Sequence, residues 1–212
     1  MSPGRGNRLR RIAKPKARIL VIGIGRAGGN IIDDLARLGV LSEFERAQGI
    51  HIIDGNHCHC HRHWKNGLAT TLLSLAPYST GGDVQRGRAL AHTHRHSLRS
   101  LLAPMDIVCL LAGMGGGTGG GMAPYVAKLT RNAGTLTIAM VTMPFAFEGI
   151  RVQRAANAIK RLKRQTARVI AFSNQLLADE LGDSAMLDTI YQVQSWRIAR
   201  HLRKLLRHLR GH

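Results

Sequence analysis

The chain has 212 residues, of which 44% are hydrophobic, and carries a formal net charge of +19. This length suits one domain, or one domain plus a tail, and no stretch approaches the roughly 20 apolar residues that span a membrane. No apolar segment of a signal peptide precedes residue 19. Three cysteines without the spacing of a disulfide framework fit a reducing compartment, so we expect a cytoplasmic protein.

Positive charge is concentrated at the two ends of the chain. Residues 1–18 contain seven Arg and Lys and no acidic residue, and residues 196–212 contain six and none. Because like charges repel one another, we expect residues 1–17 to form a disordered arm. Two other interpretations stay open. Either both ends bind a polyanion, which would be nucleic acid or an anionic membrane surface, or the excess charge reflects the cell's environment.

The first predicted elements form a βαβ unit. The apolar run Arg18–Ile22 predicts a buried parallel strand, and the glycine-rich segment Gly23–Asn30 follows it as a turn. Apolar residues at helical spacing over residues 31–38 predict a helix, and Ile50–Ile53 predicts the next strand. With an acidic residue after that strand, the glycine pattern would pass for a dinucleotide-binding fingerprint.

The most specific pattern is the run Ala112–Gly121, in which seven glycines flank one threonine. It follows the apolar strand Ile107–Leu111 and precedes a helical segment, Ala123–Leu129. Glycines let the backbone turn tightly and direct several N–H groups at one anion, and the dipole at a helix N-terminus favours the same charge. A flexible linker would instead be polar and rich in serine.

Two glycine-rich turns at the ends of two parallel strands argue against an ordinary NAD domain, which needs one. They suit a nucleoside triphosphate that lies across the carboxyl edge of the sheet. The chain lacks the G-x-x-x-x-G-K-[ST] pattern of P-loop NTPases. We therefore expect an α/β domain with a mainly parallel sheet, helices on both faces and a nucleotide pocket along the strand ends.

In this order the segments resemble the tubulin/FtsZ superfamily, and specifically the GTP-binding half of FtsZ, from about residue 17 to about residue 200. Ala112–Gly121 is similar to the family's signature loop, which grips the nucleotide phosphates. Arg18–Asn30 is similar to its first strand and first loop. Val141–Gly149 resembles the segment whose glutamate holds the ribose, and Val169–Asn174 resembles the next strand with an adjoining asparagine. Ser79–Gly82 falls where the family has a loop that senses the γ-phosphate.

The resemblance implies GTP or GDP as the ligand, with Mg as a further candidate, and it assigns no catalytic residue. Glu148 is the glutamate that the resemblance assigns to the ribose. The alternative is that Glu148 is an ordinary surface carboxylate. By position, the implied nucleotide contacts are Gly25, Arg26, Ala27, Gly28, Gly29, Asn30, Gly81, Gly82, Gly113, Met114, Gly115, Gly116, Gly117, Thr118, Gly119, Pro144, Glu148, Asn174 and Ser195.

Two positions near the nucleotide depart from the family's pattern on the last helix. Ile190 and Ser195 match the positions of an aromatic that stacks on guanine and of an aspartate that binds the base edge. A serine cannot accept two N–H groups as a carboxylate does, so we expect lower guanine affinity and selectivity. Tyr191 is a candidate to supply the lost stacking surface.

A third departure lies after the ribose glutamate. Val152 stands where the family has an arginine close to the nucleotide. The neighbouring Arg151 and Arg154 are the candidate substitutes.

The family's acidic loop, which completes the nucleotide site of the next subunit, has no counterpart in His201–His212. That segment contains no acidic residue, and we expect it to be the basic end of the last helix without a second domain. We expect hydrolysis to be weak, or to depend on a partner that completes the site. The expected partners are a second copy of the chain or a full-length FtsZ-like protein in filaments. The alternatives are a module that caps or modulates such filaments without hydrolysis, and a degenerate fold retained for polyanion or metal binding.

Apolar residues recur at three- and four-residue steps along the last helix, and basic residues occupy much of the remainder. We expect the first half of this stripe to pack against the sheet and the second half to fray. The stripe would otherwise bind a second copy or a partner's domain, or lie on a membrane surface. Its members are Leu187, Ile190, Gln194, Ile198, Leu202, Leu205 and Leu209.

A histidine and cysteine tract has no counterpart in the family. Imidazole and thiolate groups bind zinc, copper or nickel, but a structural zinc site usually draws on a second, separated ligand pair. Nothing in the sequence brings His92, His94 or His96 close to the tract. The alternative is a solvated loop beside Asp54–Asn56, which takes the place of the family's Asn-Thr-Asp turn. The candidate metal ligands are His57, Cys58, His59, Cys60, His61 and His63.

Overall fold

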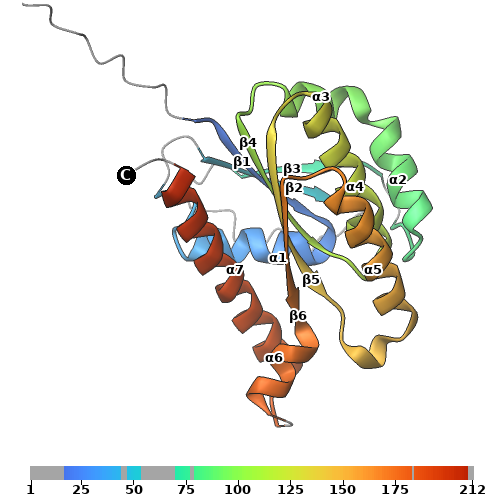
Figure 1. Ribbon diagram of the computed structural model, residues 1–212, viewed down its shortest axis with the longest axis vertical. Helices are drawn as coiled ribbons and strands as arrows, with labels where there is room; N and C mark the ends of the chain where they lie inside the picture. The colour runs from blue at the N-terminus through green and yellow to red at the C-terminus, as the bar shows by residue number, and fades with distance from the viewer. Residues whose placement is uncertain (1–16, 44–46, 54–69, 77–78, 183, 210–212) are drawn as a thin grey trace, which may run out of the picture.

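The fold is built on a six-stranded sheet in which every pair of neighbouring strands is parallel. The computed structural model describes residues 17–43, 47–53, 70–76, 79–182 and 184–209 (Figure 1). The predicted α/β fold with a mainly parallel sheet is confirmed. The strands are β1 (Ile19–Ile24), β2 (Ala47–Ile53), β3 (Thr70–Ser74), β4 (Ile107–Gly113), β5 (Leu136–Met143) and β6 (Arg168–Ser173).

Helices cover both faces of the sheet, as the sequence predicts. One face packs against α2, α3, α4 and α5, and the other packs against α1 and α7 (Figure 1). Each face forms its own apolar core, because strands that are buried on both sides carry apolar residues at successive positions. The helices are α1 (Gly25–Arg37), α2 (Val84–Thr93), α3 (Arg95–Leu102), α4 (Gly117–Asn132), α5 (Ile150–Lys163), α6 (Asn174–Leu181) and α7 (Leu187–Leu209), with a short 3-10 helix, η2 (Ala146–Glu148).

The order of the strands decides where a ligand can enter. Across the sheet it is β3-β2-β1-β4-β5-β6, so the chain builds outward from β1 in one direction and then from β4 in the other. The loops that leave β1 and β4 therefore diverge to opposite faces of the sheet. In open parallel sheets this divergence creates a crevice at the carboxyl ends of the strands, where ligands bind.

Two elements extend further into the glycine clusters than the sequence predicts. β1 continues to Ile24, and Gly23 pairs with both neighbouring strands. α4 begins at Gly117, well before the predicted start at Ala123. Glycine disfavours helix by about 1 kcal/mol relative to alanine, but packing against the sheet and α2 overrides that preference here. The glycine run is thus partly a turn and partly the first turn of a helix.

The last helix keeps its structure through its second half, so the expectation of fraying is wrong. Ile198, Leu202 and Leu206 are fully buried against the sheet and α1. The sequence predicts that Leu205 is buried, but Leu206 is the buried residue. Leu206 follows Leu202 by four residues, about one helical turn, and therefore lies on the same side of the helix. Leu187, the first predicted member of the stripe, is 51% exposed.

Arginines on the outer side of α7 hold it in place. Arg203 and Arg207 both pair with Glu43, at 2.7 Å and 3.2 Å, and Arg203 also donates to the carbonyl oxygen of Leu38 at 3.2 Å. Arg197 pairs with Glu180 on α6. The basic stripe of α7 is therefore in part an intramolecular network.

Replacing Leu202 by alanine should lower the free energy of unfolding by about 2–5 kcal/mol, the range for truncating a fully buried leucine. The same change at the half-exposed Leu187 should cost less than about 0.5 kcal/mol. Urea denaturation followed by circular dichroism measures both values. Equal effects of the two substitutions would mean that α7 does not pack on the sheet in this register.

Several sequence expectations fall outside the described residues. These are the disordered basic arm before residue 17, the turn at Asp54–Asn56 and the metal-ligand tract from His57 to His63. Within the part of the chain that the structure describes, no group of three His, Cys, Asp or Glu side chains could hold a metal ion. None of the described helices is long and apolar enough to cross a membrane.

Burial raises the pKa of Cys109 to about 12, so this thiol is a neutral core residue.

Candidate functional site

A cavity of about 450 Å³ lies at the carboxyl ends of the central strands, between the loops that follow β1, β4 and β5 and the first half of α7. We call it the strand-end cavity. Every residue that the resemblance implies as a nucleotide contact lines it, except Gly28, Gly29 and Gly81. The other described lining residues are Ile31, Ser79, Thr80, Thr142, Arg151, Tyr191 and Gln194.

The first turn of α4 forms one wall of the cavity. The N–H groups of a helix's first turn have no acceptor within the helix, and the helix dipole adds positive potential there. A Cβ on Gly119 would lie 2.1 Å from the carbonyl oxygen of Gly113, and one on Gly117 would lie 2.6 Å from that of Asp83. Gly116 differs, because a Cβ there would meet no atom within 4 Å. The run therefore combines glycines that allow close backbone packing with one that borders open space.

A hydroxyl pair joins two loops at this wall. Thr80 Oγ1 and Thr118 Oγ1 lie 3.2 Å apart, which links the loop after β3 to the start of α4. Arg154 donates to the carbonyl oxygen of Gly82 at 3.4 Å and ties the same loop to α5. Sequence reasoning placed a loop at Ser79–Gly82 but did not single out Thr80. Its position beside two glycines after a strand was the available signal.

Three predicted contacts lie elsewhere. Gly28 packs α1 against β4, since a Cβ there would lie 2.4 Å from the carbonyl oxygen of Leu111. Gly29 is buried within α1. Gly81 sits at the outer side of its loop, with φ of 60°. The glycine pattern after β1 thus reflects helix–sheet packing as well as the cavity, and Gly25, with φ of 70°, makes the turn that starts α1.

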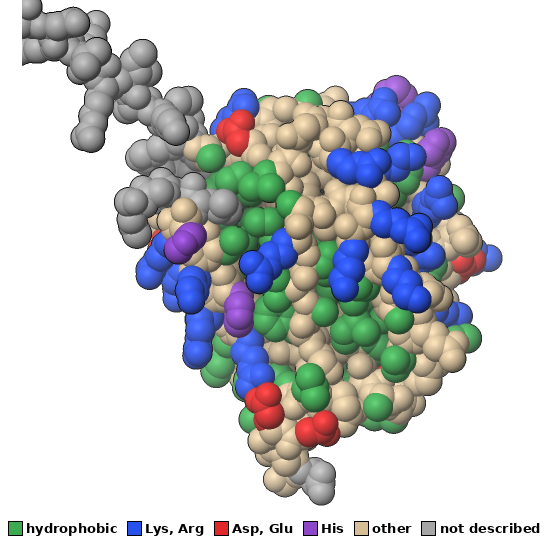
Figure 2. All heavy atoms as spheres, viewed as in Figure 1, with side chains coloured by type: hydrophobic (Ala, Val, Ile, Leu, Met, Phe, Trp, Pro, Cys, Tyr) green, Lys and Arg blue, Asp and Glu red, His purple; other side chains and the backbone are tan. Residues whose placement is uncertain are grey.

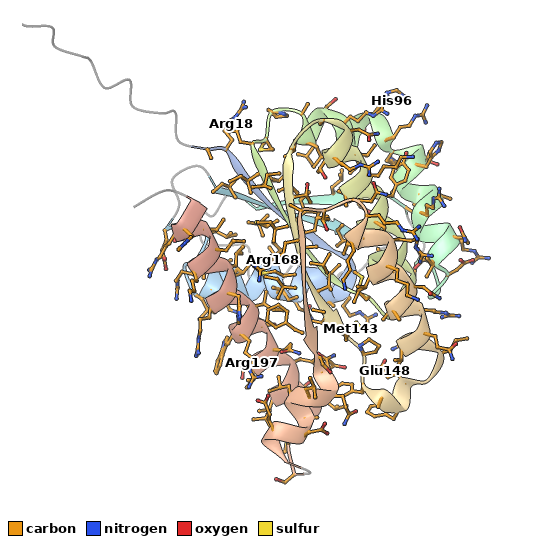
Figure 3. All side chains as sticks on the ribbon, viewed as in Figure 1. Arg18, His96, Met143, Glu148, Arg168 and Arg197 are labelled. Carbon is orange, nitrogen blue, oxygen red and sulfur yellow. The ribbon has the colours of Figure 1, made fainter. Side chains whose placement is uncertain are left out.

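Glu148 lies where β5 and β6 end, at the opposite end of the sheet from Arg18 (Figure 3). Its Oε1 accepts from the backbone N–H of Phe145 at 2.8 Å, and its Oε2 accepts from Arg151 at 2.7 Å. The side chain is 16% exposed. The contact with Phe145 is the capping box of η2, and together with Arg151 it holds the carboxylate in one orientation at the edge of the cavity.

The floor of the cavity is polar and buried. Gln194 Nε2 donates to Asn174 Oδ1 at 3.2 Å, and Gln194, Asn174 and Ser195 are 3%, 6% and 6% exposed. Sequence reasoning placed Gln194 on the apolar face of the last helix. Gln194 is the one amide in that apolar stripe, and this exception was the signal that could have identified it as a cavity residue.

Tyr191, rather than Ile190, borders the cavity. Ile190 is 3% exposed and packs in a small core with Phe145 and Leu177. The Tyr191 ring meets Phe145 edge-on at 5.9 Å between centroids. Partial burial and the negative charge of Glu148 raise the pKa of Tyr191, so it is a neutral phenol at physiological pH.

Positive groups border the cavity while only one carboxylate does. Among the described lining residues, Arg26 and Arg151 carry positive charge and Glu148 alone carries negative charge. Val152 does not line the cavity, whereas the neighbouring Arg151 does. The arrangement offers an anion-binding wall, one positioned acceptor and a polar floor.

Comparison with known proteins agrees with this geometry. Residues 18–182 match the family model described as "Tubulin/FtsZ family, GTPase domain". The cell division protein FtsZ of Pseudomonas aeruginosa is 36% identical over 175 residues, which cover 80% of this chain and 42% of that protein. FtsZ of Mycoplasmopsis pulmonis is 32% identical over 187 residues, which cover 82% and 44%. The chain therefore spans less than half the length of these relatives.

Solved structures show the same likeness. The FtsZ dimer of M. jannaschii superposes with a TM-score of 0.80 at 27% identity, covering 94% of this chain and 57% of that one. CetZ2 from Haloferax volcanii, at 22% identity and a TM-score of 0.75, shares the fold. The chain belongs to the tubulin/FtsZ family, and residues 18–182 form its GTPase domain.

Proposed function

We propose that the strand-end cavity binds GTP and that the chain acts in assemblies related to cell-division filaments. The observation that carries this proposal is the convergence of three subsites on one cavity. They are the first turn of α4, the positioned Glu148 and the polar floor made by Asn174, Gln194 and Ser195. Each suits a different part of a nucleoside triphosphate.

The phosphates would lie against the first turn of α4. Unpaired backbone N–H groups at Gly117–Gly119 and the Thr118 hydroxyl are donors, and the open space beside Gly116 leaves room for an anion. Arg26 and Arg151 add positive charge. Mg²⁺ would be held mainly through phosphate oxygens, its usual mode with nucleotides.

The ribose would be held by Glu148. A carboxylate accepts hydrogen bonds from two neighbouring hydroxyls, and the N–H of Phe145 fixes its orientation at 2.8 Å. Arg151 donates to the other carboxylate oxygen at 2.7 Å and holds it in place. Glu148 therefore has a binding role here and is not free to accept a proton from water.

The base would lie between Tyr191 and the polar floor. Tyr191 offers a ring face, and the Asn174–Gln194 pair and Ser195 offer donors and acceptors for a base edge. The floor carries no carboxylate among the described residues, so discrimination between guanine and adenine would be modest.

Hydrolysis would need a group from a partner. Activation of water requires a positioned general base, and Glu148, the one described carboxylate that lines the cavity, is already engaged. We propose that a second copy of the chain or a full-length FtsZ-like protein supplies it.

Exposed apolar side chains beside lining residues of the cavity support such a partner. Phe147 precedes Glu148 and is 76% exposed, and Ile150 precedes Arg151 and is 62% exposed. Met186, in the loop before α7, is 77% exposed. Burial of such side chains against a partner is favourable. The same side chains support the second candidate function, a module that caps or modulates filaments without turnover.

Nucleotide content and turnover test the proposal. The purified full chain is denatured, its released nucleotide is identified by chromatography, and phosphate release from GTP is measured with and without a full-length FtsZ. We expect bound GTP or GDP and slow release alone. Stimulation by FtsZ would support partner-dependent hydrolysis, and bound GTP without stimulation would support the capping module.

A variant separates the partner from the ligand. Met186→Asp should abolish stimulation or capping and leave the GTP affinity within about twofold, because Met186 does not line the cavity. If neither bound nucleotide nor GTP affinity is found, the GTP proposal is wrong. If the chain alone turns over GTP as fast as FtsZ does, partner dependence is wrong.

A further inference from the structure

A second hollow lies on the outer surface of α2, α3 and α4 and shares no lining residue with the strand-end cavity. It encloses about 700 Å³, and we call it the α2–α4 groove. The side chains that matter for its chemistry are Arg88, His92, Arg95, Arg99, Tyr125 and Lys128.

The groove is strongly basic. Four of its lining residues are Arg or Lys and none is Asp or Glu. Helices α2 to α5 together carry eleven Arg and Lys and no acidic residue. Figure 2 shows the groove's side of the molecule at the upper right, where Lys, Arg and His side chains gather without acidic ones among the described residues.

These cations lack the carboxylate partners found on the other face. On the α1 and α7 side, Arg37 pairs with Asp34, Arg197 with Glu180, and Arg203 with Glu43. Within the described ranges, Arg88, Arg99 and Lys128 form no ion pair, and the polar contact of Arg95 is with the carbonyl oxygen of His92 at 3.4 Å. Like charges held on one concave surface repel each other, so an anionic ligand there is favoured.

The shape of the groove is fixed by backbone contact. A Cβ on Gly87 would lie 2.3 Å from the carbonyl oxygen of Gly117, and one on Gly121 would lie 2.3 Å from that of Val84. α2 and α4 therefore cross in direct backbone contact. The crossing places Arg88 and Lys128, from helices far apart in sequence, along one groove.

The groove also offers rings. Tyr125 and His92 meet edge-on, with centroids 5.8 Å apart, and both line the groove. An aromatic group within a basic groove is the combination that binds single-stranded nucleic acid, because phosphates contact the cations and bases stack on the rings. A membrane surface fits less well, since none of the exposed large apolar residues in the described chain lies on α2, α3 or α4.

We propose that the α2–α4 groove binds a single nucleic-acid strand. Arg88, Arg99 and Lys128 contact its phosphates, and the Tyr125–His92 pair contacts its bases. Because the groove and the strand-end cavity have no residue in common, a nucleotide and a strand can be bound at the same time.

Two variants of equal charge test the proposal on the full chain. The groove variant is Arg88→Glu, Arg99→Glu and Lys128→Glu. The control is Lys160→Glu, Arg200→Glu and Lys204→Glu, which reverses three exposed cations outside the groove that also form no ion pair in the described structure. The probe is a fluorescently labelled thymidine strand of about 20 nucleotides, longer than the roughly 4–16 nucleotides that one small binding domain covers.

Fluorescence anisotropy is measured over a series of salt concentrations. We expect the groove variant to lose about hundredfold or more in affinity and the control to lose less than about tenfold. Each lost phosphate contact should reduce the slope of log affinity against log salt by about 0.7, so the groove variant should lose about two. Urea midpoints of both variants show whether either has lost its fold, and Arg88→Gln with Lys128→Gln is the milder groove variant if the first does not fold.

Three results would overturn the proposal. One is equal weakening by the groove and control variants, which would mean diffuse attraction by net charge. Another is no binding of the strand by the unmodified chain. The third is groove-dependent binding of phosphatidylglycerol vesicles without binding of the strand, which would assign the groove to a membrane surface.

Discussion

Replacing Gly119 by alanine is expected to reduce nucleotide affinity by about hundredfold or more. The new Cβ would lie 2.1 Å from the carbonyl oxygen of Gly113; the Cβ is fixed to the helix backbone and the oxygen belongs to the strand backbone, so the strand end or the helix start must move. Overpacking of this kind costs about 1–3 kcal/mol of stability. Loss of two charge-assisted hydrogen bonds to phosphate, at about 1.5–3 kcal/mol each, accounts for the affinity.

Gly116→Ala is the matched stability control for that variant. Gly116 has φ of −97° and ψ of 169°, which alanine adopts without strain, and its Cβ would meet nothing within 4 Å. Its free energy of unfolding should stay within about 0.5 kcal/mol of the unmodified chain. Urea denaturation and titration calorimetry with GTP measure the two quantities. Unchanged stability and affinity in Gly119→Ala would show that α4 does not pack against the end of β4 as described.

Replacing Ser195 by aspartate is expected to tighten GTP binding by about ten- to hundredfold and to leave ATP binding unimproved. Ser195 lies on the buried floor, 6% exposed, beside the Asn174–Gln194 pair. A carboxylate there accepts from the two N–H groups of the guanine edge, and a charged hydrogen bond contributes about 1.5–3 kcal/mol. Adenine presents no such pair of donors. Titration calorimetry with GTP, GDP and ATP measures the change.

The same substitution should lower the stability of the chain without nucleotide, because it buries a charge that has no partner until guanine arrives. Ser195→Asn is the control, since an amide of the same size has only one acceptor oxygen and should gain less than about tenfold. Equal gains with GTP and ATP would place Ser195 away from the base and would contradict the proposed orientation of the nucleotide.

The glycine run shows how far sequence patterns reach. Seven glycines after an apolar strand predicted an anion cradle at a helix start, and the structure has the run on the cavity wall. The pattern did not show which glycine does what. Gly117 and Gly119 allow backbones to touch, Gly116 borders open space and Gly28 packs α1 on β4. These differences depend on atoms distant in sequence, which no local rule contains.

The last helix shows a different limit. Its apolar period predicted one buried face, which Ile190, Ile198 and Leu202 confirm, but the assignment of Leu205 was off by one residue. Such a shift turns a residue by about 100° around the helix, which is enough to exchange Leu206 for Leu205 in the core. The exact phase was set by packing against α1 and the sheet.

The sequence by itself determined the α/β class, the parallel sheet and the two glycine-rich turns, because these follow from local periodicity and from spacing along the chain, and its resemblance to known sequences indicated the family. Only the tertiary structure decided which groups share a cavity. The strand order brings the ends of β1 and β4 together, and the crossing of α2 and α4 gathers cations into a groove. The phase of α7 places Tyr191, Gln194 and Ser195 at the strand-end cavity. The physical reason is that proximity between distant segments depends on which apolar faces pack against each other, and that choice is made by the whole core at once.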